Sequence, residues 1–380
     1  MVESNILWYS AVDILHNARG SHTKSFENKP GFTAFKHVIQ FFNLQIAMVD
    51  RSNTITLPIK TKVLPFLELP KFKKTNTNFE ELCLTRARFL LDKAVATNRQ
   101  LAILYSGGID STLIMTSLLT VATEKELKNH IKVLLSHTSI SENKNLFKEH
   151  ILKKCNIESS FDFTHYLGNN KYIVVTGETG DQLFGSMAIK KMFVKYGKDF
   201  VFSSVTYEKV EKIFLDNVFP ENVNLNEIEV SKCITPLFNI IKNSPIDIPT
   251  VYHFFWWLNF ILKWQSVYTR TLAYINPKYE KTLLPEENYF AFFSDSSMQL
   301  WAMNNPDKLI KDDWKSYKYI AKEAIYNFDK NEDYLINKVK FGSLRDVFIT
   351  RSPAKLIDET FTFHRKDISE NIWNDVNSFV

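Results

Sequence analysis

Cysteine is scarce in this chain, and the few cysteines that occur stand apart from one another. The 380 residues contain only three, Cys83, Cys155 and Cys233, and none belongs to a Cys-x-x-Cys pair. Isolated cysteines without regular spacing argue against a disulfide framework and against a zinc site. Glycine is also rare, at ten residues, and it nearly vanishes after residue 187.

Long apolar runs and blocks of like charge are missing as well. The longest apolar run, Val251 to Trp264, contains a histidine and an asparagine. It is well short of the roughly 20 residues that span a bilayer, so it predicts a buried helix. The N-terminus has neither a basic n-region nor a small-residue cleavage site, so no signal peptide is expected. The 47 Lys and Arg are interspersed with 42 Asp and Glu, which argues against membrane and nucleic-acid partners. A cytoplasmic protein is predicted.

The chain has enough apolar residues, 45%, to bury a full core, and its length allows two domains. Residues 1–77 form a mixed α+β segment. Within it, a β-hairpin is predicted between Leu44 and Ile59, and an exposed connector follows from Leu69 to Asn78. A helix with an acidic first turn is predicted over Phe79 to Thr97.

The residues that follow alternate between strands and helices. Strands are predicted at 101–106, 131–139 and 172–177, and helices at 111–127 and 145–154. Strand, helix, strand, helix, strand with short connections predicts an α/β fold with a doubly wound parallel sheet. Ligands of such sheets sit at the carboxyl ends of the strands, and glycine-bearing turns follow two of these strands.

Aromatic residues become frequent after residue 187, and long apolar-periodic segments predict an all-helical region there. The predicted organisation therefore has three parts. Residues 1–77 are the N-terminal segment, residues 78–345 are the main domain, and residues 346–380 are a C-terminal tail. Within the main domain, residues 98–187 form the α/β core and residues 188–345 the helical part.

The turn after the first strand, SGGIDST at 106–112, combines glycines, hydroxyls and a carboxylate. Gly107 and Gly108 let a ligand approach the backbone, and the amides of the turn with the helix N-terminus form a cavity for an anion. Three hydroxyls that can donate to phosphate oxygens lie in the same turn: Ser106, Ser111 and Thr112. Asp110 would repel a bare phosphate, so it is expected to hold Mg²⁺. The alternative is an ordinary strand-to-helix turn with an Asp or Ser cap.

The stretch SGGIDS resembles the SGGxDS pyrophosphate loop of the N-type ATP pyrophosphatases, which cleave ATP between the α and β phosphates to adenylate a substrate. This group includes the asparagine synthetase and β-lactam synthetase family. The resemblance implies an adenine nucleotide α-hydrolase-like fold, with ATP and Mg²⁺ as cofactors. It assigns nucleotide binding to the turn residues named above, together with Gly177.

A second stretch, VVTGETGDQLFGS at 174–186, resembles the S-G-E-G-x-D-E-L-F-G-G segment of asparagine synthetase. The matching positions are Gly177, Glu178, Asp181, Leu183, Phe184 and Gly185. Thr179 replaces a glycine, Gln182 a glutamate and Ser186 the last glycine. By the resemblance, Asp181 joins Asp110 as a magnesium ligand. Glu178 lies near the reacting carboxylate and the incoming nitrogen nucleophile, and is expected to be catalytic.

Two shorter matches occur nearer the C-terminus. YKYIAKEAI at 317–325 resembles the K-x-x-L-R-E-A helix of the family, and its Lys318 and Lys322 are expected to be structural. NKVKFGS at 337–343 resembles the R-x-K-x-G-F turn and aligns Lys340 with the catalytic lysine. Such a lysine would stabilise the charge that develops on pyrophosphate. The alternative for Lys340 is a solvated surface lysine.

The chain also departs from the family. Glutamine-dependent members begin with a cysteine nucleophile that heads a glutaminase domain, whereas residue 2 here is Val2. The nitrogen is therefore expected to be free ammonia, ammonia from a separate donor protein, or an amine on the substrate. The segments that select aspartate are not recoverable, so a different carboxylate is expected. Residues 1–77 could be a reduced glutaminase-like remnant, a dimerisation element of a homo-oligomer, or a lid.

These observations predict an ATP-dependent, AMP-forming amide ligase that joins a small-molecule carboxylate to ammonia or an amine. One alternative is an ATP pyrophosphatase that modifies a nucleobase or tRNA. The lack of paired cysteines argues against thiolation, and the lack of a dense basic patch argues against tRNA. Another alternative is a non-catalytic nucleotide-binding relative, against which the retention of Asp110 and Asp181 argues.

Overall fold

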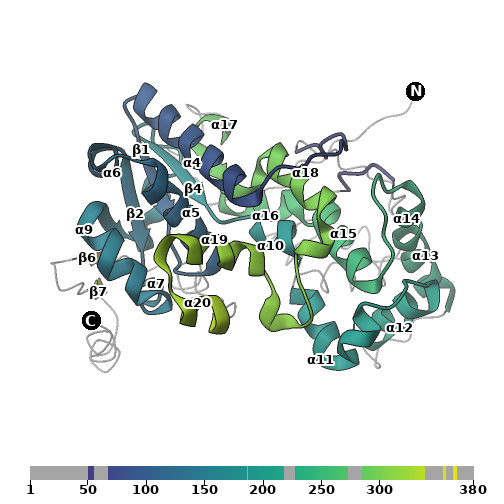
Figure 1. Cartoon of the computed structure of the whole chain (residues 1–380). Helices are drawn as coiled ribbons and strands as arrows, with labels where there is room; N and C mark the ends of the chain where they lie inside the picture. The colour runs from purple at the N-terminus through teal and green to yellow at the C-terminus, as the bar shows by residue number, and fades with distance from the viewer. Residues whose placement is uncertain are drawn as a thin grey trace, which may run out of the picture. The chain divides into compact units, whose positions relative to one another are not determined.

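A computed structural model describes residues 50–54, 67–185, 187–217, 227–272, 285–338, 354–356 and 363–365 (Figure 1). These residues divide into two compact units. The sheet unit comprises the described residues from Asn76 to Gly180, from 285 to Trp301 and from Lys315 onward. The helical unit comprises those up to Thr75, from Asp181 to 272 and from Ala302 to Trp314.

The sheet unit is built on five parallel strands in the order β3-β2-β1-β4-β5. They are β1 (Gln100–Leu104), β2 (Ile131–Leu135), β3 (Asn156–Ser159), β4 (Tyr172–Thr176) and β5 (Tyr289–Ala291). In β1 and β4 every residue after the first is buried, as expected for parallel strands covered on both faces. This α/β arrangement is compatible with a doubly wound fold, and β1, β2 and β4 confirm the three predicted strands.

Helices surround this sheet and carry its connections. They are α4 (Phe79–Ala96), α5 (Ile109–Val121), α6 (Glu124–His130), α7 (His137–Glu142), α8 (Lys144–Leu146), the π-helix η1 (Phe147–Ile151), α9 (Leu152–Lys154), α17 (Pro285–Asn288), α19 (Tyr319–Asp329) and α20 (Glu332–Asn337). Short 3-10 turns are η2 (Ser160–His165) and η3 (Phe292–Ser294), and β6 (Ala354–Leu356) pairs antiparallel with β7 (Phe363–Arg365). Helix α4 begins where predicted, because Asn78 Oδ1 accepts from the backbone N–H groups of Glu80 and Glu81.

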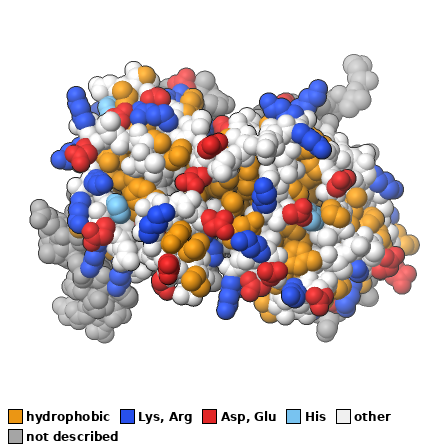
Figure 2. All heavy atoms as spheres, viewed as in Figure 1, with side chains coloured by type: hydrophobic (Ala, Val, Ile, Leu, Met, Phe, Trp, Pro, Cys, Tyr) orange, Lys and Arg blue, Asp and Glu red, His pale blue; other side chains and the backbone are white. Residues whose placement is uncertain are grey.

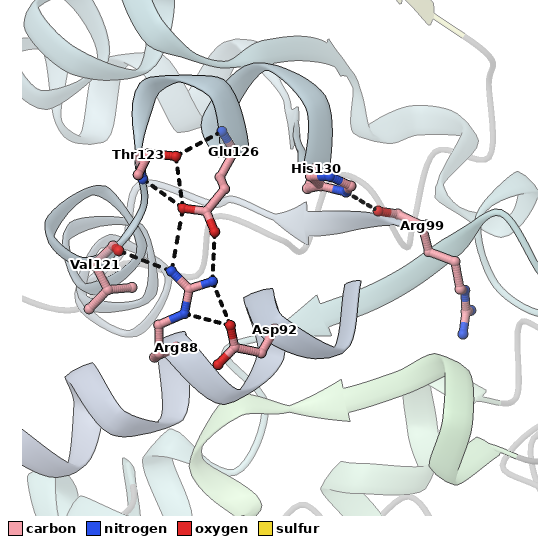
Figure 3. A network of polar contacts seen from close by, with 7 residues as sticks. All are labelled: Arg88, Asp92, Arg99, Val121, Thr123, Glu126 and His130. Atoms are coloured by element: carbon pink, nitrogen blue, oxygen red, sulfur yellow. Dashed lines mark hydrogen bonds and ion pairs between the residues drawn. The ribbon is translucent and has the colours of Figure 1, made fainter. Parts of the chain in front are cut away.

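A polar network holds α4, α5 and α6 together (Figure 3). Arg88 of α4 pairs with Glu126 of α6 at 2.7 Å, donates to Asp92 Oδ1 at 2.8 Å, and donates to the carbonyl of Val121 at the end of α5 at 3.2 Å. Thr123 and Glu126 form a reciprocal capping box that starts α6. The hydrogen bond from Arg88 is the main reason that the pKa of Glu126 falls to about 2.

Several sequence predictions about element boundaries were wrong. The strand predicted at 131–139 ends at Leu135, and the helix predicted at 111–127 breaks after Val121, because Thr123 caps a separate helix. Strands β3 and β5 were not predicted. The region after 187 is therefore not all-helical, since β5 lies within it and β6 and β7 lie in the predicted tail. Strands of three or four residues are too short to show a clear alternation.

The helical unit is dominated by helix α15 (Val251–Leu262), in which every residue is buried, as its apolar run predicts. The other helices of this unit are α11 (Met187–Val201), α12 (Tyr207–Asn217), α13 (Glu227–Phe238), α14 (Ile240–Asn243), α16 (Trp264–Leu272) and the 3-10 turn η4 (Pro306–Lys308). Helix α10 (Gly180–Phe184), helix α18 (Ser296–Asn304) and the 3-10 turn η5 (Trp314–Ser316) run across the division between the units. None of the helices in the described ranges is long and apolar enough to cross a membrane.

Three further predictions concern the hairpin, the connector before α4 and the cysteines. The predicted hairpin at 44–59 is described only at its turn, where Asn53 N–H donates to the Asp50 carbonyl at 3.3 Å, and its two strands lie outside the described residues. The connector before α4 has mostly exposed or half-buried side chains, as predicted. The three cysteines are free thiols. Figure 2 shows acidic and basic side chains interspersed on the face drawn.

Candidate functional site

The connections that follow β1 and β4 lie side by side at the point where the strand order of the sheet reverses. The chain runs outward from β1 through β2 to β3, and β4 then pairs with the other side of β1. In open α/β sheets, ligands bind outside the carboxyl ends of the strands at such a switch point. We call residues 105–108, between β1 and α5, the β1 turn, and residues 177–180, after β4, the β4 turn. Both turns were singled out by the sequence.

Gly107 is the most constrained residue of the β1 turn. Its φ of +71° lies in the left-handed region, and a Cβ at this position would approach the Ser139 carbonyl oxygen to 2.3 Å and Glu142 Cβ to 2.5 Å. Both neighbours belong to α7, so relief would require movement of backbone. Glycine is therefore required here for two steric reasons, close packing and backbone conformation.

The hydroxyls of SGGIDST are tied to the turn itself. Ser111 Oγ accepts from the Ser106 N–H at 3.1 Å and lies 3.0 Å from Ser106 Oγ. Thr112 is fully buried, and its Oγ1 donates to the Gly107 carbonyl at 3.1 Å. Thr112 thus stabilises the turn in this structure. Ser106, whose residue is half-buried, is the hydroxyl of the three that lies nearest to solvent.

The N-terminus of α5 follows the β1 turn directly, and one amide of the turn, Gly108 N–H, donates to Ser106 Oγ at 3.3 Å. Gly108 is the N-cap of α5 and supplies no side-chain acceptor to the N–H groups of the first turn. The first N–H groups of a helix have no intrahelical partner, and the helix dipole places positive potential there. The helix is 13 residues long and apolar, which makes it a rigid support. The geometry can therefore bind phosphate oxygens through backbone amides.

The β4 turn is a hydrogen-bonded turn in which Gly180 N–H donates to the Gly177 carbonyl at 3.3 Å. Thr179, its third residue, has a φ of +68°, a conformation that normally selects glycine at this position of a turn. The side chain is 1% exposed, and its Oγ1 has no hydrogen-bond partner. Glu178, the predicted catalytic carboxylate, is buried at 7% exposure in the same turn. A strained β-branched residue in a buried turn is a common mark of a functional site.

The β4 turn meets the first turn of α5 at Asp110. A Cβ on Gly180 would lie 2.6 Å from Asp110 Cγ, and a Cβ on Gly177 would lie 2.9 Å from Asp110 Cβ. The backbone of the β4 turn therefore passes directly over the Asp110 side chain, and both glycines are needed to let it pass. The structure thus brings Gly107, Gly108, Asp110, Gly177 and Glu178 to one edge of the sheet.

Lys318 completes this group and was not expected in it. Its Nζ lies 2.6 Å from Asp110 Oδ1 and 2.5 Å from Oδ2, with 1% of its side chain exposed. Burial lowers the pKa of the Lys318 ammonium, and the charge of Asp110 opposes that effect. Lys322, in contrast, donates to the Lys315 carbonyl at 2.8 Å, which agrees with the structural role predicted for it. The only sequence signal for Lys318 was the alignment of residues 317–325 with the K-x-x-L-R-E-A helix of asparagine synthetase.

Asp181 follows Gly180 directly and is the first described residue of the helical unit after the β4 turn. Its backbone is held firmly, because its carbonyl accepts from Asn259 Nδ2 at 3.1 Å and from Gly185 N–H at 3.0 Å. Trp256 Nε1 donates to the Leu183 carbonyl at 3.0 Å. Buried residues of α15 thus fix the helix that carries Asp181, while Asp110 belongs to the sheet unit.

The described residues fit a magnesium ion that arrives with phosphates better than a metal held by protein alone. No group of three or more His, Cys, Asp or Glu side chains in the described ranges is placed to hold a metal. Magnesium is usually bound by one or two carboxylates plus substrate phosphates and water. The Asp110 side chain is 21% exposed, and each carboxylate oxygen has a second lone pair beyond its bond to Lys318.

The segment that leads to the predicted catalytic lysine is anchored beside the β1 turn. Lys338, which aligns with the arginine of the family's R-x-K-x-G-F turn, forms a buried ion pair with Glu142. It also donates to the Glu142 carbonyl at 3.1 Å. Glu142 is the same residue whose Cβ faces Gly107. Lys340 itself lies outside the described residues, as do Gly342 and Ser343.

Comparison with known proteins adds no identification. No protein-family model matches the chain, and no curated protein matches its sequence.

Proposed function

We propose that this protein is an ATP-dependent, AMP-forming carbon–nitrogen ligase with an adenine nucleotide α-hydrolase-like sheet unit. The observation that carries the proposal is the contact between Gly180 and Asp110. The two motifs are separated by more than sixty residues in the chain, yet the fold brings them together at the switch point. An ordinary strand-to-helix turn would not need glycines in a second loop to make room for its aspartate.

In this proposal the β1 turn and the N-terminus of α5 bind the phosphates of ATP. The backbone amides and Ser106 would donate to phosphate oxygens. Asp110 would hold the magnesium ion that comes with the nucleotide, and Asp181 is proposed as a second ligand from the sequence resemblance alone. When bound, that ion would neutralise the phosphates and favour the departure of pyrophosphate. Lys340 is proposed to contact the departing pyrophosphate.

The proposed reaction has two steps. A substrate carboxylate oxygen forms a bond to the α-phosphorus, the bond from that phosphorus to the bridging oxygen of the β-phosphate breaks, and pyrophosphate leaves. A nitrogen nucleophile then bonds to the acyl carbon, the bond to the AMP oxygen breaks, and the nitrogen loses a proton. Glu178, buried in the β4 turn, is proposed to orient the nitrogen nucleophile. Positioning and charge stabilisation of this kind are each worth several kcal/mol in enzymes.

One observation favours a second candidate, a nucleotide-binding protein without catalytic activity. Both oxygens of Asp110 accept from Lys318, so this carboxylate is already neutralised by the chain. The two candidates differ in the fate of ATP. The ligase converts it to AMP and pyrophosphate when its carboxylate is present, whereas the binding protein leaves it intact.

The test is incubation of the chain with ATP, MgCl₂ and a metabolite extract, with the phosphorus products followed by ³¹P NMR. We expect AMP and pyrophosphate, and the mass of the new amide would identify the substrate. Asp110→Asn should lower AMP formation by at least about a hundredfold, as loss of one charge-stabilising group does elsewhere. Asp92→Asn, on the outer face of α4 with 64% of its side chain exposed, is the matched control and should keep its activity. Intact ATP, or ADP and phosphate as the products, would contradict the ligase proposal.

A further inference from the structure

Asp110 already has a cation supplied by the chain. The Lys318 ammonium contacts both carboxylate oxygens, at 2.6 Å and 2.5 Å. The lysine side chain is 1% exposed, whereas that of Asp110 is 21% exposed. The pair is therefore asymmetric: the ammonium is enclosed by protein, and the carboxylate keeps one side toward solvent. A buried charge is retained only where a partner and hydrogen bonds compensate for its lost hydration.

The backbone of Lys318 is held in an uncommon conformation. Lys318 has φ +60° and ψ +29°, a left-handed conformation that is uncommon for residues other than glycine, asparagine and aspartate. Its carbonyl accepts from the Lys322 N–H at 3.0 Å and thus starts α19, a helix that packs against α5. Strained conformations persist only where surrounding structure determines them. The start of α19 therefore places the Lys318 ammonium beside the first turn of α5.

An ammonium in that position competes with a metal ion. Magnesium binds carboxylate oxygens at a distance of about 2.1 Å, so an ion on Asp110 would lie within a few ångströms of Lys318 Nζ. Two positive charges at such a separation repel strongly in a partly buried site. Phosphate groups would change this balance, because their oxygens could accept hydrogen bonds from the ammonium and their negative charge would offset the repulsion between the two cations.

We propose that Lys318 is the resident counter-ion of Asp110, which excludes free divalent metal from this carboxylate and yields to the metal only when phosphates accompany it. Lys318 is a positioning residue in this account. Binding of the metal together with the nucleotide rests on the proposed function. The exclusion of free metal is independent of the proposed function, because it follows from the ion pair between Lys318 and Asp110 alone.

The test is a titration of the full chain with Mn²⁺ in the absence of nucleotide, followed by the EPR signal of the free ion. The unaltered chain should bind no Mn²⁺ at Asp110. Lys318→Met should gain a site at least about tenfold tighter than any in the unaltered chain, because the competing charge is gone. Asp110→Asn combined with Lys318→Met should lose that site. Lys318→Arg, which keeps the charge, should not gain it.

Two results would overturn the proposal: Mn²⁺ binding by the unaltered chain that the Asp110→Asn substitution removes, or no gain of binding in Lys318→Met. If Lys318→Met does not fold, Lys318→Asn replaces it, because asparagine tolerates the left-handed conformation. A second experiment adds ATP and measures, by equilibrium dialysis against a protein-free Mn–ATP reference, how much metal and nucleotide the chain retains. The unaltered chain should then retain both Mn²⁺ and ATP. Failure of this arm alone would reject the nucleotide-binding function and leave the exclusion of free metal standing.

Discussion

The β1 turn and the β4 turn lie at the same edge of the sheet but meet their steric demands differently. In the β1 turn, the residue with positive φ is Gly107, and the same residue makes the closest contact with neighbouring backbone. In the β4 turn the two demands are divided. Gly177 and Gly180 make the close contacts with Asp110, while Thr179 takes the positive φ.

A glycine in a sequence motif can be required for close approach of another segment or for a positive φ. The sequence alone does not distinguish these two reasons, and the comparison of the two turns does. The resembling segment of asparagine synthetase has glycine where this chain has Thr179. The structure shows that the departure affects backbone strain in the turn, whereas the glycines that make room for Asp110 are retained. A glycine that makes room for a neighbouring segment therefore cannot be replaced, whereas a glycine that only adopts a left-handed conformation can be replaced at a cost in backbone strain.

Gly107→Ala should have the largest effect on folding. The added Cβ would clash with the Ser139 carbonyl oxygen, 2.3 Å away, in addition to the strain of φ +71°. We expect a loss of about 4 kcal/mol or more in unfolding free energy, measured by urea denaturation. Gly197→Ala is the control, because Gly197 has φ +77° with nothing within 4 Å of its Cβ position. Strain alone should cost about 1 to 3 kcal/mol there. Equal losses in the two variants would show that close packing plays no part.

Thr179→Gly should have a smaller effect of opposite sign. Glycine adopts a positive φ without the steric penalty that threonine meets, so the unfolding free energy should rise by about 1 kcal/mol. The substitution also removes a buried hydroxyl that has no hydrogen-bond partner. Thr179→Val keeps the branched side chain and should therefore show less of the gain. A lower unfolding free energy for Thr179→Gly would mean that threonine stabilises the turn.

The ion pair between Arg88 and Glu126, beside the C-terminal end of α5, provides a comparison in which no two backbone segments approach closely. Arg88 holds the pKa of Glu126 at about 2, below its ordinary 4.5. A lowered pKa in the folded state stabilises the fold above the unfolded pKa, and this contribution is lost as pH falls through the folded one. The difference in stability between the unaltered chain and Glu126→Gln should thus be full above pH 4.5 and shrink toward pH 2.

The lowered pKa alone would correspond to several kcal/mol. Because the side chains of Arg88 and Glu126 are 34% and 20% exposed, solvent screening should reduce the measured pH effect to about 1 kcal/mol. Denaturation midpoints across that pH range would measure it. Glu149→Gln is the comparison: Lys153 also lowers the pKa of Glu149, but both side chains are more than half exposed, so solvent screening should make the change in midpoint smaller than for Glu126→Gln. A difference that persists unchanged at the lowest pH would show that the carboxylate charge is not the cause.

The sequence predicted the core of the sheet unit because β1, β2 and β4 are apolar runs, and the glycine-bearing turns after β1 and β4 marked the ends of those two strands. Asn78 and the acidic first turn located the start of α4. The boundary near Thr123 was missed because its capping box competes with a helical pattern that continues across it. The short edge strands β3 and β5 carry too few residues for a periodic signal.

The candidate site was predicted in part. The glycines and Asp110 were recognisable because close approach and phosphate binding need particular residue types at particular spacings. Lys318 was assigned a structural role, since a lysine far along the chain reveals its partner only through tertiary packing. The internal hydrogen bond of Thr112 was also not foreseeable, because a hydroxyl in a turn can face either the ligand or the backbone.

The central claim is that the β1 turn and the N-terminus of α5 bind the phosphates of a nucleotide, with Asp110 held in place by the β4 turn. Its most direct test is calorimetric titration of the unaltered chain and of Gly180→Ala with Mg–ATP and with adenosine. The new Cβ would lie 2.6 Å from Asp110 Cγ and push its carboxylate out of place. We predict that the unaltered chain binds Mg–ATP far more tightly than adenosine, and that Gly180→Ala loses this preference. Equal affinity of both proteins for Mg–ATP, or no binding of Mg–ATP by the unaltered chain, would contradict the account.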